Sequence, residues 1–175
     1  MNKKLQIMVE SAIMIALAVV LSFVKVWSMP QGGTISLTML PLFLLSFRRG
    51  AIAGIISGII YGAISIIIDG VIYHPMSILL DYTLAYGVIG VAGFFKKNYL
   101  GIIIGTAVGT ALRFICSLLS GAVLFAEYAP AGQNPWIYSL IYNATYMVPE
   151  LVICIVALVL LFIKGKQVFL IKSQA

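Results

Sequence analysis

Charged residues are scarce in this 175-residue chain: only 9% of its residues are Asp, Glu, Lys or Arg, whereas 62% are hydrophobic. Soluble domains carry about 25% charged and about 45–50% apolar residues. The polar surface is therefore too small to cover a water-soluble globule, and we predict an integral membrane protein. The net charge of +6 does not indicate nucleic-acid binding, because the basic residues sit in pairs between long apolar runs.

Cysteine and histidine are nearly absent as well, with two cysteines and one histidine in the chain. Cys116 and Cys154 lie inside apolar runs, which predicts neither a disulfide nor a metal framework. An intramembrane serine protease needs a histidine at the depth of its serine, whereas His74 falls in a loop. The sequence also has no ATP-binding motif. We therefore expect no catalytic residue, no metal and no cofactor, and any active transport must draw its energy from another protein or an ion gradient.

Six apolar stretches recur along the chain. They are Met8–Val26, Ile35–Phe47, Ala51–Ile68, Met76–Phe95, Leu100–Phe125 and Ile137–Ile163. A membrane-spanning helix needs about 20 residues. The second stretch is short, so it either begins earlier, in the Gly32-Gly33 loop, or does not fully cross. We predict an all-α membrane protein with six transmembrane helices and a single domain over residues 1–175.

The basic residues between these stretches predict the topology. With six crossings, one side of the membrane holds nearly all of them: Lys3, Lys4, Arg48, Arg49, Lys96, Lys97, Lys164, Lys166 and Lys172. The opposite side holds Lys25, Asp69, His74 and Glu127. Because positive loops stay inside, both termini are predicted to be cytoplasmic. Rows of glycine at every fourth residue, Gly50 to Gly62 and Gly101 to Gly109, predict tight helix packing rather than phosphate loops.

Charged side chains inside apolar stretches are costly and mark candidate sites. They are Glu10, Asp81, Arg113 and Glu150. With a rise of 1.5 Å per residue, four helices bring polar or aromatic side chains to one level about 7–12 Å below the outer surface. These side chains are Tyr61, Asp81, Ser117 and Asn143, with Tyr82 and Tyr138 nearby and Phe125, Tyr128 and Trp136 closer to the rim.

This level predicts a pocket for a flat cation that forms hydrogen bonds. A carboxylate at Asp81 pairs with positive charge, aromatic faces hold a cationic ring, and the Asn143 amide both donates and accepts. Other interpretations remain open: Asp81 pairs with Arg113, Asn143 joins two helices, and Trp136 and Tyr138 belong to an interfacial aromatic belt. An intramembrane enzyme that uses His74, or a channel built from several copies, also remains open.

Several segments together resemble the thiamine-specific substrate-binding (S) components of energy-coupling factor transporters. The resemblance runs over nearly the whole chain and rests on Met29–Ser36, Ser46–Gly50, His74-Pro75, Leu79–Tyr82, Gly121, Phe125–Pro130 and Asn134–Asn143. The small residues Ala12 and Ala16 in the first stretch are also similar to the family pattern. Each segment alone is weak, whereas their combination is specific.

The resemblance implies a six-helix fold in a bacterial plasma membrane, with high-affinity vitamin binding from outside and a first outer loop that helps to close the site. It implies three partners besides membrane lipid, namely a transmembrane coupling subunit and two cytoplasmic ATPases, with Ala12 and Ala16 facing the coupling subunit. It also implies that the ligand is thiamine or a close analogue. The implied binding residues are Asp81, Tyr82, Tyr138, Asn143 and Phe125, and the pocket argument adds Tyr61, Ser117 and Trp136.

Two departures from the family pattern bear on the ligand. Ser117 stands where relatives usually carry a histidine, and the Gly32-Gly33 loop lacks a tryptophan and a glutamate that some of them place there. Losing the histidine removes a stacking and hydrogen-bonding surface, so affinity or substrate choice is expected to differ. Another vitamin, or the pyrimidine or thiazole half of thiamine, is the alternative ligand.

Overall fold

The computed structural model describes residues 2–30, 32–69 and 74–169, and most of these residues are helical. The long helices are α1 (Lys3–Ser22), α2 (Met39–Arg49), α3 (Ala51–Asp69), α6 (Tyr99–Val123) and α7 (Pro135–Lys164). Between α3 and α6 lie α4 (Pro75–Ser77), the π-helix η1 (Ile78–Thr83), α5 (Leu84–Gly87) and the 3-10 helix η2 (Val88–Phe94). The short elements are β1 (Lys25–Ser28), β2 (Thr34–Ser36), η3 (Ala126–Tyr128) and α8 (Lys166–Phe169).

Asparagine side chains start several of these helices. The Oδ1 atom of Asn98 accepts a hydrogen bond from the Gly101 amide at 2.7 Å, and Asn134 Oδ1 accepts one from Trp136 at 2.9 Å. Each bond satisfies an amide that has no partner in the first helical turn. Gly50 separates α2 from α3, and its φ of 94° lies in the left-handed region that glycine adopts without strain.

Within the described residues, five helical segments are long and apolar enough to cross a membrane. They are Lys3–Ser22, Ala51–Ile68, Pro75–Phe94, Tyr99–Val123 and Pro135–Lys164. These segments match five of the six predicted stretches, and the protein is an all-α membrane protein. The exception is the second stretch, in which α2 has 11 residues and a length of about 16 Å, roughly half of the hydrocarbon core.

A two-stranded antiparallel hairpin precedes α2, and the sequence analysis did not predict it. Trp27 pairs with Ile35, and Ser28 pairs with Thr34. Consequently α1 ends at Ser22 rather than continuing to Val26. Extended backbone at membrane depth is tolerated only inside protein or beside a cavity. The inner strand β2 meets this condition because it is largely buried.

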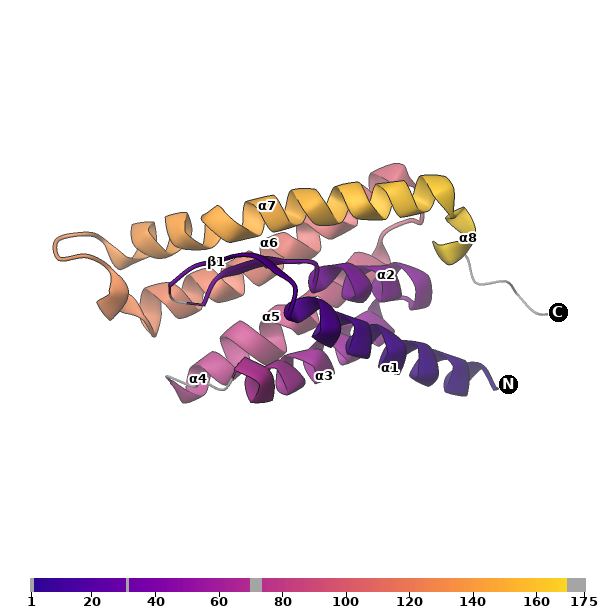
Figure 1. The fold of residues 1–175 in the computed structure, drawn as a ribbon, viewed down its shortest axis with the longest axis horizontal. Helices are drawn as coiled ribbons and strands as arrows, with labels where there is room; N and C mark the ends of the chain where they lie inside the picture. Colours follow the sequence, from indigo (N-terminus) through magenta and orange to yellow (C-terminus); the bar gives the residue numbers. More distant parts are fainter. Residues whose placement is uncertain (1, 31, 70–73, 170–175) are drawn as a thin grey trace.

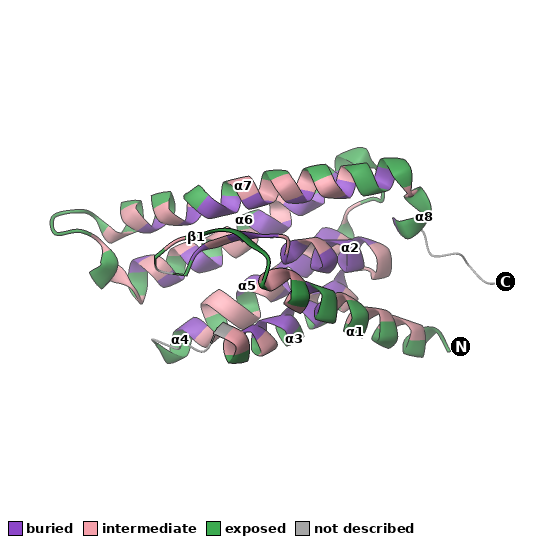
Figure 2. Cartoon of the chain, viewed as in Figure 1, coloured by how far each residue is buried: buried purple, intermediate pink, exposed green. Residues whose placement is uncertain are grey.

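Figure 1 shows how the helices are arranged. The long helices α6 and α7 lie side by side, and α3 packs against the broken segment that runs from η1 to η2. Helix α2 lies among α1, α3 and η2, while α1 begins at the end of the bundle where α8 lies. Figure 2 shows that the buried residues face the middle of the bundle, whereas much of α1 is exposed on its outer side.

The predicted glycine row on α3 packs closely against its neighbour. A Cβ atom added to Gly58 would collide with the backbone carbonyl of Tyr86, and one added to Gly62 would lie 2.5 Å from the carbonyl oxygen of Tyr82. The missing side chains therefore let two backbones touch. This contact supports η1 from behind, on the segment that carries Asp81.

Candidate solute-binding cavity

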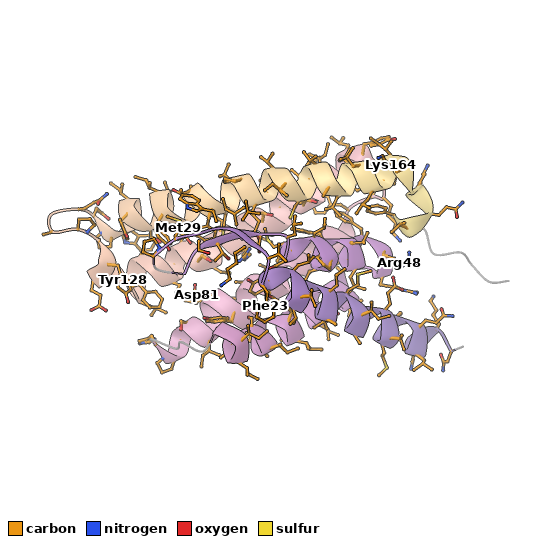
Figure 3. All side chains as sticks on the ribbon, viewed as in Figure 1. Phe23, Met29, Arg48, Asp81, Tyr128 and Lys164 are labelled. Carbon is orange, nitrogen blue, oxygen red and sulfur yellow. The ribbon has the colours of Figure 1, made fainter. Side chains whose placement is uncertain are left out.

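A cavity of about 720 Å³ lies between the hairpin and helices α3, α5, α6 and α7, with η1 forming part of its wall. This volume falls within the range of about 300–1,000 Å³ that small-molecule sites occupy. Figure 3 places two of its lining residues, Asp81 and Met29, in the half of the molecule that also contains Tyr128. Both carboxylate and hydroxyl groups reach its surface, so the cavity suits a polar solute.

The structure brings seven of the eight predicted binding residues to this one cavity. They are Tyr61, Asp81, Tyr82, Ser117, Phe125, Tyr138 and Asn143. Trp136, the eighth, is 48% exposed at the start of α7 and is not among the described residues that line the cavity. Its position matches the interfacial-belt interpretation.

The π-helix η1 carries Asp81 and Tyr82 into the cavity wall. A π-turn leaves carbonyl groups without their usual helical partners, and such turns are frequent at functional sites. Here the Thr83 hydroxyl donates to the carbonyl oxygens of Ile78 at 3.0 Å and Leu79 at 3.3 Å. The Asp81 carboxylate accepts a hydrogen bond from the Ser120 hydroxyl of α6 at 2.5 Å. Ser120 therefore holds the carboxylate, while Thr83 bonds to the backbone of the turn that carries it.

Arg113 pairs with Glu150 rather than with Asp81, which answers a question that the sequence left open. Its Nη1 atom lies 3.1 Å from a carboxylate oxygen of Glu150, and its Nη2 atom donates to the Tyr86 hydroxyl at 3.2 Å. The guanidinium carbon also lies 4.6 Å from the centre of the Tyr86 ring. Glu150 is almost completely buried, with 1% of its surface exposed.

Asn143 both lines the cavity and joins two helices. Its Nδ2 atom donates to the Ser139 carbonyl at 2.8 Å and to the Ser117 carbonyl of α6 at 3.4 Å. Its Oδ1 atom accepts a hydrogen bond from the Tyr146 hydroxyl at 2.6 Å. These bonds fix the amide group, and one lone pair of Oδ1 remains for a solute.

The hairpin contributes wall residues that the sequence analysis did not single out. The Gly33 amide donates to the Tyr142 hydroxyl at 3.1 Å, and the Ser36 hydroxyl donates to Glu150 at 3.3 Å. Tyr142 and Tyr146 follow Tyr138 at intervals of four residues, and neighbouring rings in this row lie 6.0 Å apart. This spacing places them on one helix face and was the signal available in the sequence.

His74, which an enzyme mechanism would need, has a structural role. It is the N-cap of α4, and its Nδ1 atom accepts a hydrogen bond from the Met76 amide at 3.1 Å. No group of three or more potential metal ligands occurs in the described parts of the chain. His74 therefore contributes to the start of a helix.

The fold defines a multi-pass helical membrane protein with a cavity between its helices. A family model described as thiamine transporter protein (Thia_YuaJ) matches residues 8–170. The chain belongs to this family, which is a family of transporters in the bacterial plasma membrane rather than of enzymes. The resemblance found in the sequence motifs is thereby confirmed.

Two relatives and one solved structure are similar over almost the whole chain. The thiamine transporter ThiT of Bacillus subtilis is 41% identical over 99% of this chain and 97% of its own length. ThiT of Lacticaseibacillus paracasei is 26% identical over 98% of this chain and 94% of its own. The structure of ThiT from Listeria monocytogenes has a TM-score of 0.87 and 24% identity, covering 96% of this chain and 99% of that one. That structural likeness supports the fold.

Proposed function

We propose that this chain is the substrate-binding S component of an energy-coupling factor importer and that it binds thiamine in the cavity beneath the hairpin. The observation that carries the proposal is the convergence of the Asp81 carboxylate, the Asn143 amide and a set of tyrosines on one cavity. The relative from Bacillus subtilis, named a thiamine transporter, supports this choice of solute.

The chemistry of thiamine complements the cavity wall. Its thiazolium ring is cationic and pairs with Asp81, while the faces of Tyr61 and Tyr82 suit a charged flat ring. Its aminopyrimidine presents a donor to Asn143 Oδ1. Tyr138, Phe125 and Ser117 supply the remaining contacts in the proposed site. Free thiazole or pyrimidine halves would each satisfy only one side of this arrangement.

We further infer that β2 and α2 together make a second crossing, which gives six crossings in one domain with both termini cytoplasmic. Arg48 and Arg49 end α2 at the end of the bundle where α8 also lies (Figure 1). Lys96 and Lys97 join η2 to α6, as the positive-inside rule requires for the cytoplasmic side. Burial, with Arg48 and Arg49 nearby, lowers the pKa of Lys97.

Helix α1 is the proposed docking surface for the transmembrane coupling subunit. Ala12 and Ala16 are exposed on it, while Ile15 and Ala18 face the bundle. Small residues four apart allow another helix to approach closely in lipid. Two cytoplasmic ATPases would supply the energy, because the chain carries no ATP-binding motif of its own.

Calorimetry on the purified chain tests the proposal. The wild type is expected to bind thiamine, and the Asp81→Asn variant is expected to bind it at least about a hundredfold more weakly, because a charge-assisted contact is lost in a partly buried site. Competition with the separate pyrimidine and thiazole halves distinguishes the alternative ligands. A wild-type protein that binds no thiamine, or an Asp81→Asn variant with unchanged affinity, would overturn the assignment.

A further inference from the structure

Glu150 lies behind the cavity rather than in it. It is buried in α7, and it is not in the cavity wall among the residues that the structure describes, whereas its partner Arg113 is. A buried charge is retained only when it is paired, and removing one member of such a pair leaves the other uncompensated. Glu150 therefore determines what the Arg113 guanidinium does at the cavity surface.

Asp81 and Arg113 share the wall of the cavity, and each is held by a different partner. Ser120 binds Asp81, while Glu150 and Tyr86 bind Arg113. Arg113 and Ser120 lie seven residues apart on the same face of α6, separated by about 10 Å along the helix axis. The Nε atom of Arg113 is buried and has no hydrogen-bond partner among the described residues. The arginine thus has a donor left over for a carboxylate.

The net charge in and behind the cavity wall follows from these contacts. Two carboxylates, Asp81 and Glu150, stand against the single guanidinium of Arg113, which leaves one negative charge. Lys25 also lines the cavity, but it is exposed on β1, where water screens its charge. The negative charge lies on the carboxylate that faces the solute, because Glu150 already compensates the arginine.

We propose that Glu150 is a specificity-determining residue that holds Arg113 away from Asp81 and so keeps the cavity selective for a cationic ring. This inference rests on the proposed function, since it assumes that a cation binds beside Asp81. Without the Glu150 carboxylate, the Arg113 guanidinium turns to Asp81 and their charges cancel. The cavity then loses its preference for a positively charged solute. Glu150 acts through Arg113 and does not touch the solute.

The experiment compares two ligands of nearly equal shape on the purified full-length chain. One is thiamine, and the other is an analogue in which an uncharged thiophene ring replaces the thiazolium. In Glu150→Gln, thiamine affinity is expected to fall by about tenfold to a hundredfold, the weight of one unit charge across a protein interior, while affinity for the neutral analogue changes less than about threefold. A purely structural role for Glu150 would lower both affinities together.

Two further variants keep the test decisive where Glu150→Gln folds poorly. Arg113→Gln removes the cation instead and is expected to preserve or increase the preference for thiamine over the neutral analogue. The double variant Arg113→Gln with Glu150→Gln retains the single charge of Asp81 and is expected to restore the wild-type preference to within about threefold. A lower preference in Arg113→Gln, or no restoration in the double variant, would overturn the inference.

Glu10→Gln is the matched control, because Glu10 forms the same kind of ion pair with Arg48 and Arg49 at the other end of the bundle. It is expected to leave the preference between the two ligands unchanged. A shift as large as that of Glu150→Gln would overturn the inference by showing that loss of any such pair has this effect. If the wild type bound neither ligand, the proposed function itself would fail, whereas equal losses in Glu150→Gln would remove only the role of Glu150.

Discussion

The two ends of the bundle are built from different side chains. The end near the hairpin holds a cavity lined by hydroxyls, a carboxylate and tyrosines, many of which are fixed by hydrogen bonds. Away from the cavity wall, the side chains of Phe43, Phe47, Phe162 and Phe169 are each at most 4% exposed and pack against other rings or against helix backbone. In Figure 3, Asp81 lies in the first half, and Arg48 and Lys164 lie in the second.

Glycine residues allow close packing in both regions, but they contact different groups there. At the aromatic end, glycines of α6 accept rings: a Cβ added to Gly109 would lie 2.8 Å from the Phe43 ring, and one added to Gly105 would lie 3.0 Å from the Phe47 ring. At the cavity end, Gly62 of α3 instead lies against the backbone of η1. Phenylalanine rings fill the space at Gly105 and Gly109, whereas the η1 backbone fills it at Gly62, on the segment whose side chains line the cavity. Stability and binding should therefore respond to substitutions at different ends.

Phe43→Ala should produce the largest effect and should separate stability from binding. Truncating a fully buried phenylalanine leaves a cavity that costs about 3–5 kcal/mol. Unfolding of the purified protein by denaturant would measure this loss. Phe94→Ala is the matched control, because Phe94 is 73% exposed on η2 and should change stability little. Thiamine affinity of the folded Phe43→Ala protein should stay close to wild type, and a parallel loss would contradict the separation of the two ends.

Gly33→Ala should show the opposite pattern, with weaker binding and little loss of stability. An added Cβ atom would lie 2.7 Å from Cδ1 of Tyr146 and 3.2 Å from the Tyr142 hydroxyl, so the hairpin would have to move. Because the hairpin can relieve this overlap by moving away from α7, we expect the cost of overpacking, about 1–3 kcal/mol, to appear as a loss in thiamine affinity of about fivefold to a hundredfold. We expect most of the affinity loss to come from faster dissociation of thiamine. The fluorescence of Trp27 in β1 can monitor this release.

Tyr142→Phe distinguishes displacement of the hairpin from loss of one hydrogen bond. It removes only the hydroxyl that accepts from the Gly33 amide. The expected cost is about 1 kcal/mol, so its effect should be smaller than that of Gly33→Ala. If Gly33→Ala released thiamine no faster than the wild type, the hairpin would not retain the solute.

Much of the fold was predictable because the length of an apolar stretch indicates whether a helix can cross a membrane, and five of the six stretches contain such helices. The level shared by Asp81, Ser117 and Asn143 followed from counting residues inward from the outer surface. The hairpin was not predicted, because its strands have only three or four residues. In the sequence, such short segments resemble a loop or the end of a helix. Its signal was the pair of glycines between short segments containing Trp27, Thr34 and Ile35.

Partner choice among charges could not be predicted from helix depth. Asp81 and Glu150 both lie in apolar stretches, so the sequence allows Arg113 to pair with either carboxylate. The rotation of α6 and α7 about their axes decides the pairing, and that rotation is set by packing over the full length of both helices. The π-turn at η1 likewise has no simple sequence pattern, although it changes which way Asp81 points.

Thr83→Val should have the smallest effect and tests whether the π-turn matters to the cavity. The hydroxyl of Thr83 bonds to two carbonyl groups in the turn that presents Asp81. Valine keeps the shape and removes these bonds, at a cost of about 0.5–1.5 kcal/mol. If loss of these bonds displaces the Asp81 carboxylate, thiamine affinity should fall about twofold to tenfold. Calorimetry measures this change.

Thr145→Val is the control for that last comparison. Its hydroxyl bonds to the Ile141 carbonyl at 2.8 Å in the same local manner, but it lies on the exposed face of α7. Thiamine affinity should be unchanged in this variant. Equal effects of the two substitutions would mean that the π-turn has no special role, and the distinction between the cavity end and the rest of the bundle would then depend on the hairpin and the buried charges alone.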